Sequence, residues 1–171
     1  GNDIQAGTTS GAATYSALEI ANGNAGAVVK NNYIHDCLNP TTSVWGMYGI
    51  GITGSSNNSA ISIYNNFIRD ISGYGTSSLG NQYAGSGIAL TVGVLGVKIN
   101  NNTIVQSSSA LSGTMCLFVN SATATLAECQ NNIFVNDVNS QYSTVIYTAA
   151  TGNISGAAMN NNSYYRNAIP S

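Results

Sequence analysis

The sequence predicts an all-β fold, a parallel β-helix in which short coils stack into a solenoid. The first observation behind this prediction is an Asn-Asn phrase that returns every 30 to 36 residues along the chain. Its copies are Asn31-Asn32-Tyr33-Ile34, Asn65-Asn66-Phe67-Ile68, Asn101-Asn102-Thr103-Ile104, Asn131-Asn132-Ile133-Phe134 and the looser Asn161-Asn162-Ser163-Tyr164, with a degenerate copy at Gly1-Asn2-Asp3-Ile4. A phrase repeated at such a period is typical of solenoids, because each repeat buries its apolar face on the next.

The second observation is an alternation of apolar and polar residues around the copies of the phrase. One alternating run directly precedes the phrase, another lies earlier in the period, and a third begins right after it. The members of the first set are Ala27/Val29, Ile61/Ile63, Val97/Ile99, Ala127/Cys129 and Ala157/Met159; those of the second are Leu18/Ile20, Ile50/Ile52, Ile88/Leu90, Leu117/Val119 and Ile146/Thr148; the third starts at Ile34, Ile68, Ile104, Phe134 and Tyr164. Period-two alternation predicts half-buried strands. We therefore expect about five coils of three short strands each.

The repeat leaves room for one domain only, residues 1–171. Its coils are expected at roughly 1–31, 32–65, 66–101, 102–131 and 132–161, and the remainder begins a next coil. The chain begins on a turn with a third strand and finishes just past the equivalent strand. We therefore expect a fragment of a longer solenoid, whose open ends stack on further coils of the same chain or on other copies.

The asparagines have a mechanical explanation. A sharp turn between two strands favours a residue that tolerates the left-handed backbone conformation, as Asn does. Equivalent side chains on coils stacked about 4.8 Å apart can hydrogen-bond to one another as a ladder. The ladder residues are expected to be Asn32, Asn66, Asn102, Asn132 and Asn162.

One stretch carries a resemblance to a known superfamily. Gly49-Ile50-Gly51-Ile52, followed by Ile61-Ser62-Ile63-Tyr64-Asn65-Asn66-Phe67-Ile68, resembles the right-handed parallel β-helix repeat of the pectate-lyase-like superfamily. The resemblance covers nearly the whole chain and implies a right-handed coil. It does not specify a function, because lyases, hydrolases, phage spikes and adhesins share this scaffold.

The composition is poor in charge. Only 6% of the residues are charged and the net charge is −2. This composition favours an extracellular or cell-surface protein over a cytosolic one, and we expect the protein to be bacterial. The four scattered cations do not form a nucleic-acid footprint, and no apolar run is long enough to span a membrane. Two neighbours in the expected register, Lys98 and Glu128, should form an exposed ion pair.

The three cysteines are expected to be free thiols. Cys37 and Cys116 fall three coils apart, about 14 Å at the strand spacing and too far for a disulfide. In the expected alternation Cys129 faces the core, whereas Cys116 faces outward.

A polar cluster is the first candidate for chemistry. His35-Asp36 and Arg69-Asp70 hold the same place in adjacent coils, so stacking sets His35 beside Arg69 and Asp36 beside Asp70. Paired carboxylates beside a cation can share acid and base duties. The superfamily resemblance adds that uronate-cleaving members use an arginine or lysine base with calcium-binding acids, and that glycosidase members use clustered aspartates. The alternative is a set of ion pairs that anchors the loops. No metal site or cofactor is expected, apart from calcium if the chain is a lyase.

An aromatic group is the second candidate. Trp45, Tyr48, Tyr74 and Tyr83 lie in or beside two long loops, 37–47 and 72–85, which leave adjacent coils and should project side by side. Flat rings on a rigid face suit stacking on sugars, although the same rings can instead pack the loops onto the coils. Long loops on a rigid scaffold are common binding sites.

Two functions of different class remain open. The first is a secreted or cell-surface scaffold or adhesin that binds a polysaccharide or cell-surface glycan through the loop edge of coils two and three. The second is part of a polysaccharide lyase or glycoside hydrolase with the polar cluster as its site. The sparse charge favours the first, a protein that is not an enzyme, because a uronate substrate calls for a basic cleft.

Overall fold

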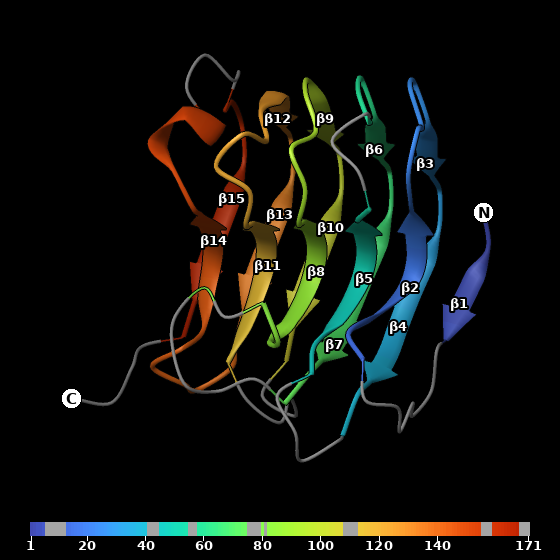
Figure 1. The fold of residues 1–171 in the computed structure, drawn as a ribbon. Helices are drawn as coiled ribbons and strands as arrows, with labels where there is room; N and C mark the ends of the chain where they lie inside the picture. Colours follow the sequence, from blue (N-terminus) through green and yellow to red (C-terminus); the bar gives the residue numbers. More distant parts are fainter. Residues whose placement is uncertain are drawn as a thin grey trace.

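The computed structural model is a parallel β-solenoid of about four turns (Figure 1). It describes residues 1–5, 13–40, 45–54, 58–74, 80, 82–107, 113–154 and 159–167. No α-helix occurs in these residues, and one short 3-10 turn, η1 (Thr151–Asn153), interrupts the strands. The all-β prediction is therefore confirmed, while the hand of the coil stays a prediction.

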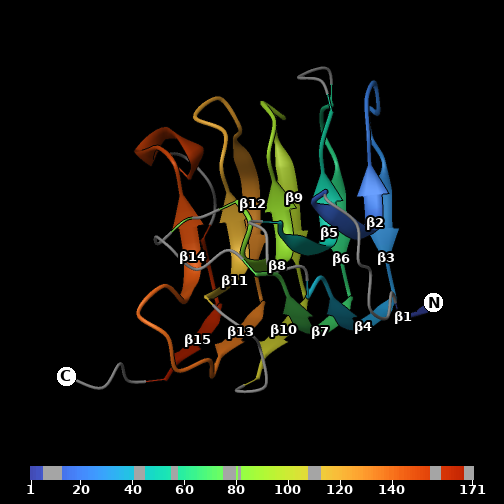
Figure 2. The same cartoon turned by 60° about the horizontal axis from the view of Figure 1, so that its bottom comes forward.

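The strands form three parallel sheets that run side by side along the solenoid (Figures 1 and 2). The five-stranded sheet contains β2 (Tyr15–Ile20), β5 (Met47–Ile52), β8 (Gly85–Leu90), β11 (Thr114–Val119) and β14 (Thr144–Thr148). The four-stranded sheet contains β3 (Val28–Lys30), β6 (Ser62–Tyr64), β9 (Val97–Asn100) and β12 (Leu126–Gln130). The six-stranded sheet contains β1 (Asp3–Gln5), β4 (Tyr33–Leu38), β7 (Phe67–Ser72), β10 (Thr103–Gln106), β13 (Ile133–Asn136) and β15 (Ser163–Arg166). Each coil visits them in that order.

The expected number of five coils is wrong, because about four are complete. Four coils, beginning at β2, β5, β8 and β11, contribute a strand to all three sheets, whereas β14 is followed by η1. The buried side chain of Asn153 holds this turn, since its Nδ2 donates to the carbonyls of Ser121 and Ala124 at 2.8 and 2.6 Å. The strand expected around Ala157 and Met159 falls mostly in residues 155–158, outside the described part of the chain, and Met159 itself is not in a strand.

The inward residues of the three sheets build one continuous core. Many of its fully buried members are isoleucines from successive coils, among them Ile34, Ile50, Ile63, Ile88 and Ile104. Strand partners lie directly above one another, as in the rows Ile34↔Ile68 and Ile50↔Ile88. A β-branched side chain packs well on such a pleated, stacked surface, which explains why isoleucine recurs at these positions.

Both expected roles of the Asn-Asn phrase are confirmed. The first asparagine of each phrase has a positive φ of 55° to 58°, the left-handed turn between the four-stranded and six-stranded sheets; these residues are Asn31, Asn65, Asn101, Asn131 and Asn161. The second asparagines form a ladder in which each Nδ2 donates to the next Oδ1 at 2.9 to 3.1 Å, from Asn32 through Asn66, Asn102 and Asn132 to Asn162. Asn2 extends the ladder at the other end, 3.0 Å from Asn32.

The five-stranded sheet contains a row at which the alternation shifts. The register of the strand pairing leaves out Gly49, Gly87 and Cys116. The alternation of inward and outward side chains is therefore offset by one residue between the two parts of each strand that flank this row. Tyr48 therefore lies outside the core although Ile50, two residues later, lies inside it. Gly49 is required there, because a Cβ would lie 2.6 Å from the carbonyl oxygen of Gly87.

This shift corrects one prediction about the cysteines. Cys116 does not face outward but is fully buried in the core, and burial raises the pKa of its thiol. Cys129 faces the core as expected, and burial raises its pKa to about 11. Cys37, Cys116 and Cys129 are all free thiols. Buried thiols of raised pKa are poor nucleophiles, so Cys116 and Cys129 act as small apolar side chains.

Candidate functional site

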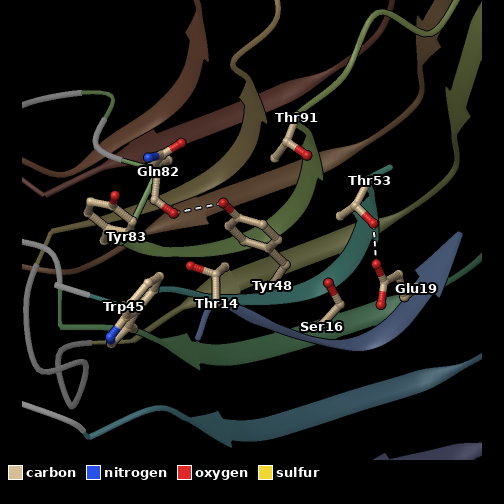
Figure 3. A pocket seen from close by; sticks show the side chains of 9 residues that line it. All are labelled: Thr14, Ser16, Glu19, Trp45, Tyr48, Thr53, Gln82, Tyr83 and Thr91. Atoms are coloured by element: carbon tan, nitrogen blue, oxygen red, sulfur yellow. Dashed lines mark hydrogen bonds between the residues drawn. The ribbon is translucent and has the colours of Figure 1, made fainter. Parts of the chain in front are cut away.

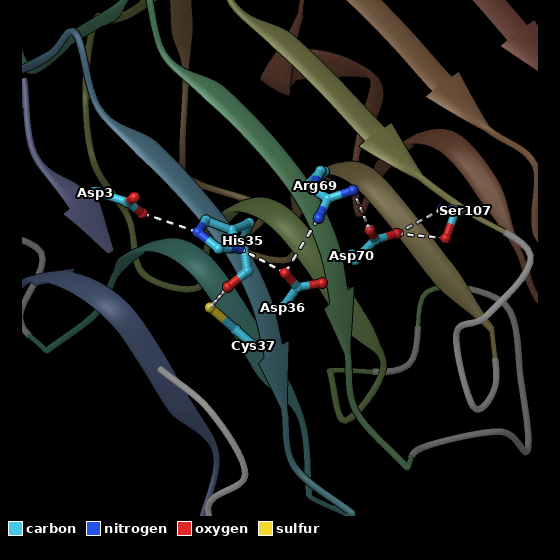
Figure 4. A network of polar contacts seen from close by, with 7 residues as sticks. All are labelled: Asp3, His35, Asp36, Cys37, Arg69, Asp70 and Ser107. Carbon is cyan, nitrogen blue, oxygen red and sulfur yellow. Dashed lines mark hydrogen bonds and ion pairs between the residues drawn. The ribbon is translucent and has the colours of Figure 1, made fainter. Parts of the chain in front are cut away.

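The two groups of residues singled out by the sequence lie on different faces of the solenoid. His35, Asp36, Arg69 and Asp70 form a polar cluster on the outer face of the six-stranded sheet (Figure 4). Trp45, Tyr48 and Tyr83 line a groove on the outer face of the five-stranded sheet (Figure 3). The polar residues are inside strands β4 and β7, whereas Trp45 and Tyr83 belong to the long loops.

Local strand geometry brings the polar cluster together. His35 and Arg69 are direct neighbours in the pairing of β4 with β7, as predicted, and each follows a fully buried isoleucine, Ile34 or Ile68. Asp36 and Asp70 have left-handed backbones with φ of 51° and 54°, a conformation that Asp tolerates better than most residues.

His35 lies between two carboxylates. Its Nδ1 is 2.6 Å from Oδ2 of Asp36, and its Nε2 is 2.8 Å from Oδ1 of Asp3 on β1. The ring also stacks on Tyr33, with centroids 4.1 Å apart. Because both ring nitrogens can act as donors only in the imidazolium form, these contacts favour the charged ring. The hydrogen bond to Asp36 is the largest cause that raises the pKa of His35, and the same bond lowers the pKa of Asp36.

Arg69 links the two aspartates. One guanidinium nitrogen, Nη2, lies 3.2 Å from Oδ2 of Asp36, and the other, Nη1, lies 3.4 Å from Oδ2 of Asp70. Asp70 also accepts hydrogen bonds from the backbone N–H and the hydroxyl of Ser107. The contacts run from β1 through β4 and β7 to the end of β10, so the cluster ties four adjacent strands together (Figure 4).

Most polar atoms of the cluster already have partners, with the exception of the buried Nε of Arg69, and the cluster has little capacity left for proton transfer. Both imidazole nitrogens of His35 face carboxylates, and the described contacts occupy both oxygens of Asp70. An imidazolium held by two anions is a poor general base near neutral pH, because its proton is stabilised. None of the four residues lines the groove. The catalytic role predicted for them stays a prediction.

The groove has a volume of about 350 Å³. Its lining comes from β2, β5, the turns that follow β5 and β8, and the long loops: Thr14, Ser16, Glu19, Trp45, Tyr48, Thr53, Gln82, Tyr83 and Thr91. Figure 3 shows Trp45 and Tyr83 at one end, Glu19 with Thr53 at the other, and Tyr48 between them. The surface is thus a mixture of flat rings, hydroxyls and one amide, with a single carboxylate.

The aromatic residues are held rigidly. Trp45 and Tyr83 come from the two different long loops and pack edge to face, with ring centroids 5.7 Å apart and an interplanar angle of 75°. The hydroxyl of Tyr48 donates to the carbonyl oxygen of Gln82 at 2.7 Å, which ties the second loop to strand β5. Burial raises the pKa of Tyr48. Tyr74, the fourth predicted aromatic, is 38% exposed and does not line the groove.

A second, smaller apolar cluster packs beside the groove on the outer face of the five-stranded sheet. Its buried members are Tyr48, Ala84, Ala89, Met115 and Phe118, with Tyr147 packed against them. The ring centroid of Phe118 lies 6.4 Å from that of Tyr48 and 5.7 Å from that of Tyr147. Phe118 is thus fully buried although it faces outward, with Tyr48 and Tyr147 from other strands of the sheet beside it.

Sequence reasoning missed the polar half of the groove. Ser16 and Glu19 lie on the outer face of β2, and Ser16 is the direct neighbour of Tyr48 in the pairing of β2 with β5. Aligning the strands of successive coils would have placed Ser16 beside Tyr48. Gln82 and Thr91 lie outside strands, and no repeat signal marks them.

Other surface features are structural. Lys98 Nζ lies 2.7 Å from Oε1 of Glu128 on the four-stranded sheet, so this predicted ion pair is confirmed. Among the described residues, no three or more His, Cys, Asp or Glu side chains are grouped as a metal site would need. The described part of the chain also contains no helix that is long and apolar enough to cross a membrane.

Fold and site together define a parallel β-solenoid with an aromatic groove on one outer face. No protein-family model, curated protein or solved structure matches the chain.

Proposed function

We propose that this protein is a secreted or cell-surface β-solenoid scaffold that binds a glycan in the groove of Trp45, Tyr48 and Tyr83. The observation that carries the proposal is the rigid edge-to-face pair of Trp45 and Tyr83 at one end of a groove otherwise lined by hydroxyl and amide side chains. The apolar faces of sugar rings stack on aromatic rings, while sugar hydroxyls need hydrogen-bonding partners.

The dimensions of the groove suit a short stretch of glycan. A volume of about 350 Å³ lies at the lower end of the range of roughly 300–1,000 Å³ that is typical of small-molecule sites. The aromatic residues are anchored before any ligand arrives, because Tyr48 is hydrogen-bonded to the loop that carries Tyr83. Preorganised rings lose little conformational entropy on binding, and this supports affinity.

Binding without turnover is the better supported form of this proposal. Most glycoside hydrolases place two carboxylates on either side of the scissile bond, but among the described residues Glu19 is the only carboxylate that lines the groove. The sequences of the two long loops, 39–46 and 73–84, contain no Asp, Glu, Lys, Arg or His. A lyase would need a cation for its uronate, and the described residues that line the groove include none.

The kinship with the pectate-lyase-like superfamily belongs to the same proposal. It rests on the stretch from Gly49 to Ile68 and on the stacked isoleucine and asparagine rows. The extracellular location, with a polysaccharide or surface glycan as partner, rests on the low charge and on the aromatic groove. The superfamily resemblance raises the alternative of a lyase or hydrolase, and the experiment below includes it as an outcome.

The experiment is a glycan-array and turnover screen of four proteins. These are the parent, Trp45→Ala, Tyr74→Ala as an aromatic control outside the groove, and the double variant Asp36→Ala/Asp70→Ala. We expect binding by the parent, at least a fivefold loss in Trp45→Ala and less than a twofold change in Tyr74→Ala, since stacking of a flat ligand ring on one aromatic side chain contributes about 1 to 3 kcal/mol.

The outcomes separate the candidate functions. Equal binding by the parent and by Trp45→Ala would overturn the groove as the site. New reducing ends or unsaturated uronate absorbance that disappear in the double aspartate variant would make the protein an enzyme that uses the polar cluster. Absence of binding and of turnover on every glycan would leave the fold without a carbohydrate role.

A further inference from the structure

We propose that Glu19 makes the groove selective for uncharged sugars and excludes uronic acids, an inference that rests on the proposed glycan-binding function. Glu19 lies at the end of the groove opposite Trp45 and Tyr83 (Figure 3). A glycan that stacks on the rings and continues along the groove must therefore pass this carboxylate. The acid has no cation beside it in the groove lining.

The position of Glu19 is fixed by β2 and its neighbour. Glu19 is the residue before buried Ile20, so it faces outward, and its partner in the pairing with β5 is Gly51. A side chain at Gly51 would collide with Ser16, because a Cβ there would lie 2.2 Å from the Ser16 hydroxyl oxygen. The absence of a side chain leaves the surface beside Glu19 open. The carboxylate accepts a hydrogen bond from the hydroxyl of Thr53, which holds it at this end of the groove.

The sequence contains no other charged residue in the strands of this sheet or in the turns and loops beside the groove. The sequences of β2, β5, β8, β11 and β14 contain Glu19 as their single Asp, Glu, Lys, Arg or His. No charged residue or histidine occurs in the turns 21–27, 53–61 and 91–96 or in the loops 6–14, 39–46 and 73–84. Because those loops contain no Lys, Arg or His, none of them can place a cationic side chain over the groove.

A uronate in the groove would be penalised twice. Its carboxylate would lose water without gaining a cationic partner, and burial of an uncompensated charge is unfavourable. It would also lie close to Glu19, and the repulsion between two like charges about 4.5 to 6 Å apart lowers the affinity about threefold to fivefold even at the dielectric constant of water. Neutral hexoses and their hydroxyls avoid both penalties and can donate hydrogen bonds to Glu19.

The test compares matched pairs of oligosaccharides that differ only in oxidation of C6 from alcohol to carboxylate. Titration calorimetry with EDTA in the buffer gives the ratio of neutral to uronate affinity for the parent, for Glu19→Gln and for Glu128→Gln. Glu128→Gln makes the same charge change on the four-stranded sheet, where the acid pairs with Lys98. We expect the parent to bind the neutral glycan at least tenfold more tightly. The ratio should fall about threefold to fivefold in Glu19→Gln and stay constant in Glu128→Gln.

Three results would contradict the account in different ways. Uronate binding equal to or tighter than neutral binding would overturn the selectivity and leave glycan binding intact. A neutral preference that Glu19→Gln does not reduce would remove Glu19 as its cause. Lack of binding by every neutral and acidic member of the pairs would overturn the proposed function itself. The parent ratio should also fall as salt is raised, because repulsion between exposed charges is screened.

Discussion

Asn66 and Asn102 are linked by a buried hydrogen bond in which Nδ2 of Asn66 donates to Oδ1 of Asn102 at 3.0 Å, across 36 residues of sequence. The same Oδ1 accepts the backbone N–H of Asn66 at 3.1 Å. Nδ2 of Asn66 also reaches the carbonyl oxygens of Val29 and Tyr64, each at 3.1 Å. One side chain therefore satisfies polar groups from three successive coils, which explains why the phrase repeats.

Loss of a ladder residue should destabilise the fold. Asn66→Ala and Asn102→Ala remove the side chains that satisfy buried backbone groups, and an unsatisfied buried donor or acceptor costs about 1 to 3 kcal/mol. We expect each variant to lower the free energy of unfolding by that amount, measured by urea denaturation. Asn22→Ala, at an exposed asparagine in the turn after β2, is the control and should change stability by no more than about 0.5 kcal/mol. Parent-like unfolding of both ladder variants would show that the ladder is not structurally important.

The first asparagine of each phrase offers a matched test of backbone strain. Asn65 is exposed and has a φ of 56°. A left-handed residue with a Cβ costs about 1 to 2 kcal/mol, and glycine avoids that cost. Asn65→Val should therefore lower stability by about that amount or more, while Asn65→Gly should be close to neutral. Equal unfolding free energies for the valine and glycine variants would contradict the assigned turn conformation.

The polar cluster predicts a pH dependence of stability. The pKa of His35 is raised from its usual 6.5, so its contribution is fully present below pH 6.5 and is lost as pH rises through the raised value. The pKa of Asp36 is lowered from 3.8, so its contribution is present above pH 3.8 and is lost as pH falls through the lowered value. The cluster should therefore stabilise most between about pH 3.8 and 6.5.

Thermal melts of the parent and of His35→Gln test this window. The difference in Tm between the two proteins should be largest in mildly acidic buffer and should shrink as the pH rises above 6.5. Lys98→Gln, which breaks the ion pair on the four-stranded sheet, is the control and should show no such change across this range. A His35 difference that grows with pH would mean that the ring is neutral in the fold.

Burial of Phe118 on an outward face gives a further prediction. Phe118→Ala should cost about 3 to 5 kcal/mol, as for a residue in a closed core, because Phe118 is fully buried between Tyr48 and Tyr147. Phe67→Ala, on the outer face of the six-stranded sheet, is the comparison. Phe67 is 41% exposed and stacks on Tyr33, so its loss should cost no more than about 1 kcal/mol. Similar costs for the two variants would mean that the five-stranded sheet is uncovered.

The sequence predicted the parts of this fold that repeat. Isoleucine rows, the left-handed first asparagines and the ladder all follow from a local rule applied once per coil, and the pairing of His35 with Arg69 follows from the same register. Features confined to one row or one coil were not predictable in this way. Cys116 was misplaced because the strand alternation shifts at its own row, and no apolar pattern signals that shift.

The site was predictable only in part for a related reason. Trp45, Tyr48 and Tyr83 stand out by residue type, and the structure gathers them in one groove. Tyr74 has the same chemistry but lies outside it, and Glu19 was overlooked because a lone acid on a strand resembles any solvated residue. Which face a loop covers depends on contacts between side chains far apart in sequence, such as Tyr48 with Gln82.

The most direct test of the central claim uses the only tryptophan of the chain, Trp45. Its fluorescence, excited selectively over tyrosine, reports on the groove itself during titration with a glycan identified on the array. The account predicts a saturable change in Trp45 emission whose midpoint equals the calorimetric Kd, and the same midpoint in the double variant Asp36→Ala/Asp70→Ala. Binding detected by calorimetry without any change at Trp45 would place the glycan elsewhere and contradict the account.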